Sequence, residues 1–504
     1  MARLFFKELQ PMATRPNILL IMTDQQRYDS LGCYGSRVVP TPSLDRLAAD
    51  GTLFETCTVN NPLCTPSRAS MMTGKHLPGH GLYRLYDDLP ENEILFTEHL
   101  QRLGYETALI GKLHVCSRTL EGQKRHPHDG FDIYEWSLDP RVEIDSKYNA
   151  YSKWLNERDP SLLERLRHKG EHVPQELHFS HWAADRTIAY LERAVQADRP
   201  FFCKMSIFDP HSPYDDYPEG FEDFVDPEFL TDPIIVEDEY ADLPILDRLS
   251  VGSGGRLSDR TPERIRAIRT GYYASIALAD MEIGRVMSAL DRLGLKENTL
   301  VIFLSDHGDM LGDHLQYFKG GFLYDPCIRV PFMLSWPGKF SGGRRSSELV
   351  QPHDIAATCL SAAGMPASEI VSIMPDSVDL VPFCSDDSRE LREYAVCLYR
   401  NSGLKFPMDG SYYQDPPVIA SAIRDKRHKL TLYHGTTQGQ LFDLEEDPME
   451  KRNLWTSENH TGIRLALTQG LLDWLTRQEI RELGSRGAGS IPPWWDPVAK
   501  ARVG

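Results

Sequence analysis

Four short runs of mainly apolar residues lie far apart in the first 304 positions of the chain. They cover residues 17–22, 107–110, 201–208 and 299–304. A strand with one face in water would alternate between apolar and polar residues, and these runs do not. They therefore predict strands of a parallel sheet that is covered on both faces.

Helical patterns separate these runs, over residues 97–103, 180–194 and about 262–293. In the second of them Ala184, Ile188 and Leu191 fall on one face. Strands that alternate with helices predict an α/β fold, with a large mixed, mostly parallel sheet between layers of helices.

Polar residues follow each of the four predicted strands. They are Thr23-Asp24-Gln25, Gly111-Lys112-Leu113-His114, Asp209-Pro210-His211 and Ser305-Asp306-His307-Gly308. In open α/β sheets, ligands bind in the crevice beyond the carboxyl ends of the strands. If the four strands are parallel, all these residues face one crevice. A lone aspartate after a strand is usually a turn former, but four such endings favour a shared site.

Beyond the strands, the acidic, proline-containing segment 219–260 is predicted to be a long loop, either a lid over the crevice or a solvated surface excursion. Runs at 395–399, 429–433 and 439–443 predict a small antiparallel sheet, and 463–477 a helix. We expect a catalytic domain over residues 1–380. A smaller C-terminal subdomain over 381–504 would carry an aromatic tail at 492–495, which suggests docking onto another subunit or onto the parent domain. We also expect a homo-oligomer.

Composition narrows the class of protein. The chain has 504 residues, 41% hydrophobic and 25% charged, and no apolar run approaches the length of a membrane span. Residues 1–16 lack the apolar core of a secretion signal, and the nine cysteines show no regular spacing, so we expect a cytoplasmic protein without disulfides. A net charge of −18 argues against nucleic-acid binding and means that an anionic substrate needs a local positive centre.

Such a centre is indicated by Asp24, Gln25, Asp306 and His307. Carboxylate and amide oxygens suit Ca²⁺, Mg²⁺ or Mn²⁺, and one imidazole does not change that preference. Two aspartates that converge without a cation would repel each other. The alternative is that Asp24 and Asp306 only cap turns.

The segment Cys64-Thr65-Pro66-Ser67-Arg68 runs into an apolar helical pattern. Taken alone it fits a buried structural thiol, with Pro66 in the first turn of a helix. Together with the other blocks, the chain resembles the type I sulfatases of the alkaline phosphatase superfamily. The further matching blocks are Gly104-Tyr105-Glu106-Thr107, Gly111-Lys112-Leu113-His114, Asp209-Pro210-His211-Ser212-Pro213, Ser305-Asp306-His307-Gly308-Asp309, Lys319-Gly320, Leu441-Phe442-Asp443-Leu444 and Asp447-Pro448.

The resemblance implies that a formylglycine-generating enzyme oxidises Cys64 to formylglycine, whose hydrate both binds the metal and attacks sulfur. It implies one divalent ion, with Ca²⁺ favoured, bound by Asp24, Gln25, residue 64, Asp306 and His307. Physical roles can be assigned to the remaining polar residues from their charge. Arg68 would hold the diol, Lys112 and Lys319 would neutralise the sulfate, His211 would be the acid with Lys319 as its rival, and His114 would be the base.

Two departures from the family pattern keep alternatives open. Gln25 stands where many sulfatases carry a second aspartate, and the Asp24-Gln25 pair is similar to that of phosphonate monoester hydrolases, although these typically lack the Lys112 and His114 pair. No asparagine follows His80-Gly81, where many relatives have one. We expect a hydrolase of small aryl or alkyl sulfate esters. The alternatives are a phosphonate or phosphate diester hydrolase and a catalytically silent binding protein.

Overall fold

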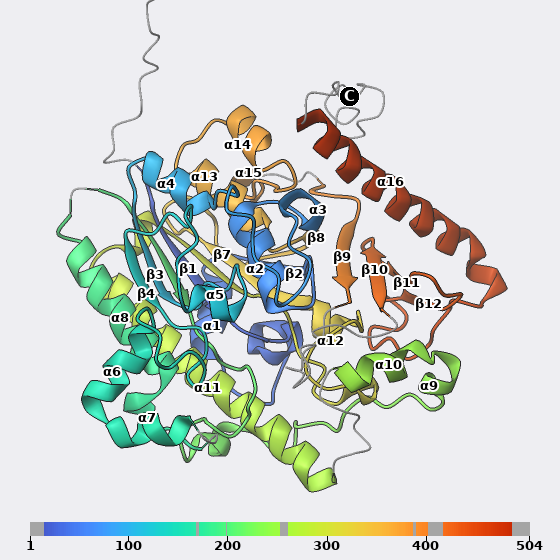
Figure 1. The fold of residues 1–504 in the computed structure, drawn as a ribbon, viewed down its shortest axis with the longest axis horizontal. Helices are drawn as coiled ribbons and strands as arrows, with labels where there is room; N and C mark the ends of the chain where they lie inside the picture. The colour runs from blue at the N-terminus through green and yellow to red at the C-terminus, as the bar shows by residue number, and fades with distance from the viewer. Residues whose placement is uncertain are drawn as a thin grey trace, which may run out of the picture.

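The computed structural model describes residues 15–167, 171–197, 199–252, 261–386, 390–401 and 417–485. Its main element is an eight-stranded sheet with the order β4-β3-β5-β1-β6-β7-β2-β8 (Figure 1). The four strands predicted from the apolar runs lie next to one another and pair in parallel, as expected. They are β3 (Glu106–Gly111), β5 (Phe201–Ser206), β1 (Asn17–Thr23) and β6 (Thr299–Ser305).

The outer strands of this sheet were not predicted. They are β4 (Ile133–Trp136), β7 (Arg329–Ser335), β2 (Thr52–Thr58) and β8 (Arg344–Val350). Strand β7 runs antiparallel to both β6 and β2, while β2 and β8 pair in parallel. The sheet is therefore mixed but mostly parallel.

Helices cover both faces of the sheet, which explains why β1 is apolar along its length. Ile18, Leu20 and Met22 pack on one side and Leu19 and Ile21 on the other. The first side carries α2 (Cys64–Thr73), α4 (Phe96–Arg102) and α13 (Asp354–Ala362), and the second carries α1 (Pro42–Ala49), α8 (Phe179–Ala194) and α11 (Pro262–Arg292). Shorter helices are α3 (Leu77–His80), α5 (Arg118–Glu121), α6 (Ala150–Arg158), α7 (Pro160–Leu166), α12 (Asp325–Ile328), α14 (Ala367–Ile373) and α15 (Val381–Asp386).

The prediction of one long loop over 219–260 is wrong for the part that the structure describes. This part forms a 3-10 turn at Phe221–Phe224 and the helices α9 (Glu239–Asp242) and α10 (Ile245–Gly252). Helix α10 forms because Leu246 and Leu249 pack into the hydrophobic core. Glu239 also anchors the segment, since its Oε1 accepts a hydrogen bond from the Tyr324 hydroxyl at 2.5 Å. Residues 253–260 lie outside the described residues.

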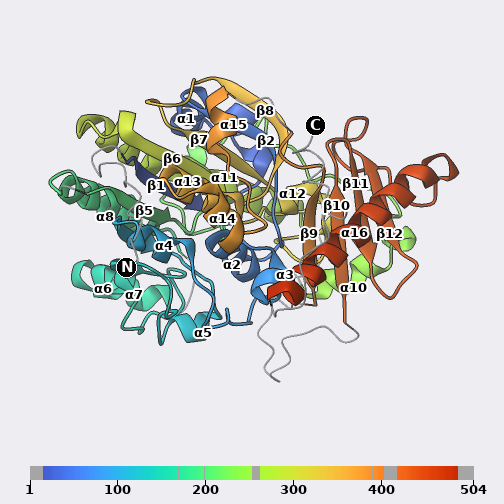
Figure 2. The ribbon, with the colours of Figure 1, turned by 90° about the horizontal axis from the view of Figure 1, so that it is seen from above.

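A second, antiparallel sheet follows, with the order β12-β11-β10-β9. Its strands are β9 (Ala395–Arg400), β10 (Ile419–Arg424), β11 (His428–Tyr433) and β12 (Gly439–Asp443), and α16 (Thr461–Ser485) packs across it (Figure 2). The small sheet and its helix confirm the expectation, apart from β10, which was missed. The domain boundary at residue 380 stays a prediction, and the aromatic tail lies outside the described residues.

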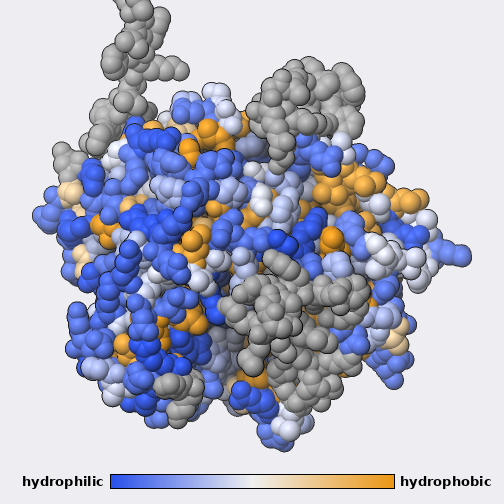
Figure 3. Space-filling view, in the orientation of Figure 1, coloured by the Kyte–Doolittle hydropathy of each residue, from blue (hydrophilic) through white to orange (hydrophobic). Residues whose placement is uncertain are grey.

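The face of the molecule drawn in Figure 3 is mainly hydrophilic. A hydrophobic area at its upper right lies over α16. Leu465 and Leu472 of this helix are exposed. None of the helices in the described part of the chain is both long enough and apolar enough to cross a bilayer.

Candidate active site

The polar residues that follow the central strands meet at one edge of the large sheet. Asp24 follows β1, Lys112 follows β3 and Asp306 follows β6. The first residue of α2, Cys64, is brought to the same place, so that the amino-terminal end of this helix faces the site. The positive end of a helix dipole favours an anion there.

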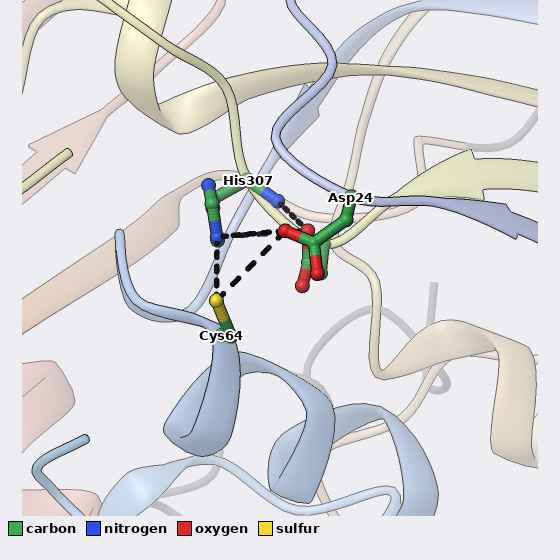
Figure 4. A group of neighbouring side chains, drawn as sticks. Asp24, Cys64 and His307 are labelled. Atoms are coloured by element: carbon green, nitrogen blue, oxygen red, sulfur yellow. Dashed lines mark hydrogen bonds and ion pairs between the residues drawn. The ribbon is translucent and has the colours of Figure 1, made fainter. Parts of the chain in front are cut away.

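Four side chains form a group with the geometry of a metal site. The ligand atoms of Asp24, Cys64, Asp306 and His307 all lie within 4.8 Å of one another, and all four residues are buried (Figure 4). The sulfur of Cys64 lies 3.1 Å from His307 Nε2 and 3.9 Å from Asp24 Oδ1. His307 Nδ1 donates to the carbonyl of Gly308 at 3.0 Å, which leaves Nε2 to face the group. Together these atoms could bind a cation.

The side chain of Gln25 is held beside this group. Its amide nitrogen donates to Asp309 Oδ2 at 2.5 Å and to the Tyr214 hydroxyl at 3.2 Å. Its Oε1 is buried and has no hydrogen-bond partner among the described residues. Its backbone, at φ 65°, donates N–H to Asp306 Oδ1 at 3.1 Å. A buried amide oxygen without a partner, next to two carboxylates, fits a hard divalent cation.

Arg68, one helical turn after Cys64 in α2, links Asp24 and Asp306. Its guanidinium donates to Asp306 Oδ2 at 2.6 Å and to Asp24 Oδ2 at 3.2 Å, and it is completely buried. Further bonds go to Ser206 Oγ and to the carbonyl of Lys112. The hydrogen bonds that the structure records for Arg68 therefore act on residue 64 through the carboxylates rather than directly.

Two lysines supply the local positive charge that the acidic chain needs. Lys112 Nζ lies 2.5 Å from Asp24 Oδ2, and Lys319 Nζ lies 2.9 Å from Cys64 Sγ. Burial opposes ionisation of the Cys64 thiol, but Lys112, Lys319 and His307 lower its pKa well below the usual value. Burial and Cys64 also oppose ionisation of Asp24, yet its pKa is lowered by Lys112, His211 and Arg68. The site is thus built to stabilise negative charge at residue 64.

His211 and Lys319 form one hydrogen-bonded pair. His211 Nδ1 donates to the carbonyl of Ser212 at 2.7 Å, so its Nε2 accepts from Lys319 Nζ at 2.9 Å. The two residues considered as the acid thus share one hydrogen bond next to Cys64. The choice between them stays open, and the proton can be delivered along this pair.

His114 lies next to Thr65, on the loop after β3. Its Nε2 is 3.0 Å from Thr65 Oγ1, and its Nδ1 is buried with no partner among the described residues. Burial, with the nearby charge of Lys112, lowers the pKa of His114 to about 4. The imidazole is therefore neutral near pH 7, which is the state a base requires.

Several residues around the site were missed by the sequence reasoning. Asp309 orients Gln25, and Ser206 accepts from Arg68. Glu121 and Lys204 hold the loop that carries Lys112 and His114. Asp309 could have been found, because it belongs to the same short block as Asp306. The others lie in no motif, and only the fold brings them to the site.

Comparison with known proteins identifies the family. The sequence matches the family described as Sulfatase over residues 16–365. The chain belongs to the sulfatase family. A second match, to the family described as N-sulphoglucosamine sulphohydrolase, C-terminal, covers residues 312–477 and includes the small sheet and most of α16.

Sulfatase-family relatives with different named substrates are about equally similar to this chain. An arylsulfatase of Clostridium perfringens is 31% identical over 498 residues, covering 94% of this chain and 96% of the relative. A choline-sulfatase of Rhizobium meliloti is 30% identical over 464 residues, covering 89% and 83%. The crystal structure of a phosphonate monoester hydrolase of Agrobacterium radiobacter superposes with a TM-score of 0.77 at 26% identity, covering 92% and 96%. The chain is thus a sulfatase-family hydrolase whose substrate these likenesses leave open.

Proposed function

We propose that this protein hydrolyses sulfate monoesters of small aryl or alkyl alcohols, with a nucleophile derived from Cys64. The observation that carries the proposal is the environment of Cys64. Its sulfur lies within hydrogen-bond reach of Lys319 and His307, at the start of α2 and next to Asp24. A thiolate is a soft ligand. It is therefore a poor partner for the hard, oxygen-preferring cation that the surrounding side chains would bind. Oxidation of Cys64 to formylglycine during maturation replaces sulfur with the oxygens of an aldehyde hydrate.

The remaining residues then have distinct tasks. One hydroxyl of the hydrate loses its proton to solvent and its oxygen attacks sulfur, and the S–O bond to the alcohol breaks while the pair of His211 and Lys319 supplies a proton to the leaving oxygen. His114 takes the proton of the second hydroxyl, the C–O bond to the sulfate breaks, and the aldehyde is formed again. Addition of water to the aldehyde completes the cycle, so water never has to attack the sulfur.

Asp24, Gln25, Asp306 and His307 would hold a divalent cation together with residue 64. Such an ion supplies Lewis acidity and lowers the pKa of an oxygen nucleophile. The oxygen-rich donor set favours Ca²⁺ over zinc, with Mn²⁺ and Mg²⁺ as alternatives because Gln25 carries no charge. Lys112 and Lys319 would neutralise the sulfate oxygens.

The proposal is tested by mass spectrometry and kinetics on the same preparation. The peptide that contains residue 64 should carry an aldehyde in place of the thiol. The preparation should hydrolyse 4-nitrophenyl sulfate, in proportion to the modified fraction. An unmodified thiol in protein from its native host, with no sulfate ester hydrolysed, would favour the silent binding protein instead.

A second candidate is hydrolysis of phosphonate monoesters or phosphate diesters. Two observations favour it: the Asp24-Gln25 pair, and the close superposition with the Agrobacterium radiobacter phosphonate monoester hydrolase. Lys112 and His114 support sulfate through the family resemblance, since phosphonate monoester hydrolases typically lack this pair. A specificity constant for 4-nitrophenyl phenylphosphonate that exceeds the sulfate value by orders of magnitude would reverse our choice.

A further inference from the structure

A buried glutamate at the end of α5 holds the loop that carries Lys112 and His114. Glu121 is 2% exposed. Its Oε2 accepts from the backbone N–H of His114 at 3.0 Å and from the indole of Trp136 at 3.0 Å. Its Oε1 accepts from the N–H groups of Val115 at 2.6 Å and Cys116 at 3.2 Å. One carboxylate thus satisfies three consecutive backbone donors.

These donors need a special acceptor because of the shape of the loop. His114 has φ 59°, in the left-handed region, so the chain leaves the extended path of β3 abruptly. Such a conformation costs on the order of 1–3 kcal/mol and persists only where its surroundings impose it. N–H groups that point the same way in a tight turn form a concavity that favours a negative charge.

The opposite end of the loop is held just as firmly. The carbonyl of Lys112 accepts from Arg68 Nη1 at 3.1 Å and from Lys204 Nζ at 3.1 Å. Lys204 is fully buried, in the middle of β5. Arg68 and Lys204 donate to the carbonyl at the start of the loop, and Glu121 accepts from the N–H groups at its end. His114 therefore lies two residues after the carbonyl that Arg68 and Lys204 hold, and its own N–H is bound by Glu121.

We propose that Glu121 is a positioning residue of the catalytic site, which fixes the backbone of residues 114–116 and thereby holds the His114 imidazole beside residue 64. The inference rests on the proposed function, in which His114 takes the proton of the second hydroxyl of the hydrate. Glu121 acts through the loop and does not touch the substrate.

The variant Glu121→Gln tests this directly. The amide has one accepting oxygen, and its NH₂ group would face a backbone N–H, so the loop cannot keep all its bonds. Because a shift of about 1 Å in a catalytic group can cost on the order of 100-fold, we expect kcat to fall by about 30- to 300-fold. His114 acts in the release step, so KM should fall together with kcat, and kcat/KM should change by less than about 3-fold. The shorter Glu121→Asp keeps the charge, and we expect a smaller loss of kcat.

Asp280 offers a matched control. It is also 2% exposed, and its carboxylate accepts from the N–H groups of Ser43 at 3.1 Å and Leu44 at 2.8 Å. These bonds hold the start of α1 on the opposite face of the sheet. Asp280→Asn should lower the melting temperature as Glu121→Gln does, but leave kcat within about twofold of wild type.

A double-mutant cycle separates positioning from general destabilisation. If Glu121 acts through His114, Glu121→Gln should lower kcat by less than about 3-fold in a His114→Ala background. An equal loss in both backgrounds would overturn the inference, as would kcat within twofold of wild type for both Glu121 variants. The cycle uses whichever ester the wild type hydrolyses, so an inactive sulfate assay counts against the proposed function alone.

Hydrogen exchange provides a readout that does not depend on activity. Amides of residues 114–116 should lose protection in Glu121→Gln or Glu121→Asp, while those of Ser43 and Leu44 keep it. In Asp280→Asn the pattern should be reversed. Unchanged protection at 114–116 in both Glu121 variants would show that the carboxylate does not hold the loop, and would overturn the inference.

Discussion

Among the described residues, two of the clusters of buried charged side chains differ in how their charges are paired. The catalytic cluster consists of Asp24, Cys64, Arg68, Lys112, Asp306, His307 and Lys319. The inter-sheet cluster consists of Asp325 of α12, Arg424 of β10, Lys429 of β11 and Glu450. Both are buried, and both contain two carboxylates among cations.

In the inter-sheet cluster, opposite charges face each other directly. Lys429 Nζ lies 2.6 Å from both Asp325 Oδ1 and Glu450 Oε1, and Arg424 Nη1 lies 3.2 Å from Asp325 Oδ2. The bonds run from the second sheet to α12, so the cluster joins the two parts of the fold. Its charges neutralise one another without a ligand.

In the catalytic cluster, by contrast, electron-rich atoms converge. Asp24 Oδ1 and His307 Nε2 are 3.6 Å apart with the Cys64 sulfur beside them, and Gln25 Oε1 has no partner among the described residues. Such an arrangement favours binding of a cation, whereas in the inter-sheet cluster each carboxylate faces an ammonium or guanidinium group. The pairing of charges, more than their burial, separates a binding site from a structural cross-link.

The largest effect that we expect is the loss of activity in Cys64→Ala. Removing a nucleophile should lower kcat by about 10⁴-fold or more while the fold is retained. Cys359→Ala, which alters another fully buried cysteine on α13, is the control and should stay active. Steady-state kinetics with 4-nitrophenyl sulfate measures both. Catalysis that survives Cys64→Ala would contradict our assignment of the nucleophile.

Lys429→Met should break the inter-sheet cluster. Removing one partner leaves Asp325 and Glu450 buried with less compensating charge, which we expect to cost about 3–5 kcal/mol of stability. Because the cluster is structural, kcat should stay within about threefold of wild type. Urea unfolding and kinetics on the same variant check the two outcomes. A loss of kcat as large as that of a catalytic lysine would mean that this cluster also shapes the active site.

Lys112→Met should have the opposite profile. Loss of the ammonium removes a charge that opposes Asp24 and would neutralise the sulfate, so kcat should fall by about 10²- to 10³-fold. The control is Lys296→Met, which breaks a partly exposed ion pair with Asp50 and should change little. If both lysine variants have similar kcat values, Lys112 has no role in sulfate neutralisation.

Metal ions should bind at the catalytic cluster and not at the inter-sheet cluster, and this binding should stabilise the folded protein. Calcium that binds only the folded state adds about 2.7 kcal/mol at a free concentration 100 times its Kd. We expect the melting temperature of chelated protein to rise on calcium titration. Asp306→Asn should largely lose this rise, and Lys429→Met should keep it. An equal rise in Asp306→Asn would place the bound ion elsewhere.

The smallest effect that we expect is a change in the pH dependence of stability, caused by the buried imidazole of His80, which lies outside both clusters. His80 Nε2 bonds Ser70 Oγ at 2.9 Å, and its Nδ1 accepts from the Leu82 N–H at 3.1 Å. Burial lowers the pKa of His80 to about 3 from the usual 6.5. Between about pH 6.5 and pH 3, the His80 imidazole is protonated in the unfolded chain but not in the folded chain. Stability should thus fall in this window by at most about 1.4 kcal/mol per pH unit from this group.

The variant His80→Gln should flatten that dependence. The free energy of unfolding, measured by urea titration between pH 7 and pH 4.5, should decline less steeply than in wild type. A wild-type slope that persists in the variant would assign the acid sensitivity to other groups. We expect a smaller change in kcat than for any variant of the catalytic cluster.

The central strands and long helices were predictable because local pattern and burial agree. Strands β1, β3, β5 and β6 are covered on both faces, so their apolar runs are visible in the sequence. The outer strand β8 is partly exposed. Its buried and exposed residues do not alternate regularly, so its sequence shows no clear two-residue period. Helix α10 was missed because its few apolar residues lie in an acidic, proline-containing stretch.

The candidate site was predictable to the extent that its residues lie in short motifs after strands. The structure brings Asp24, Cys64, Asp306 and His307 together, with Lys319 beside them. It places His211 and Lys319 in one hydrogen-bonded pair, which no spacing in the sequence indicates. Their roles in catalysis stay predictions until the kinetic tests are made.

The amino-acid sequence by itself determined which strands are buried, which polar residues follow them and which family the motifs resemble. These properties depend on neighbours within a few positions along the chain. Only the tertiary structure decided that Glu121 holds the His114 loop, that Arg68 links two aspartates and that Lys429 joins the second sheet to α12. A single charged residue has no local pattern, and its role depends on the buried partner that folding places opposite it.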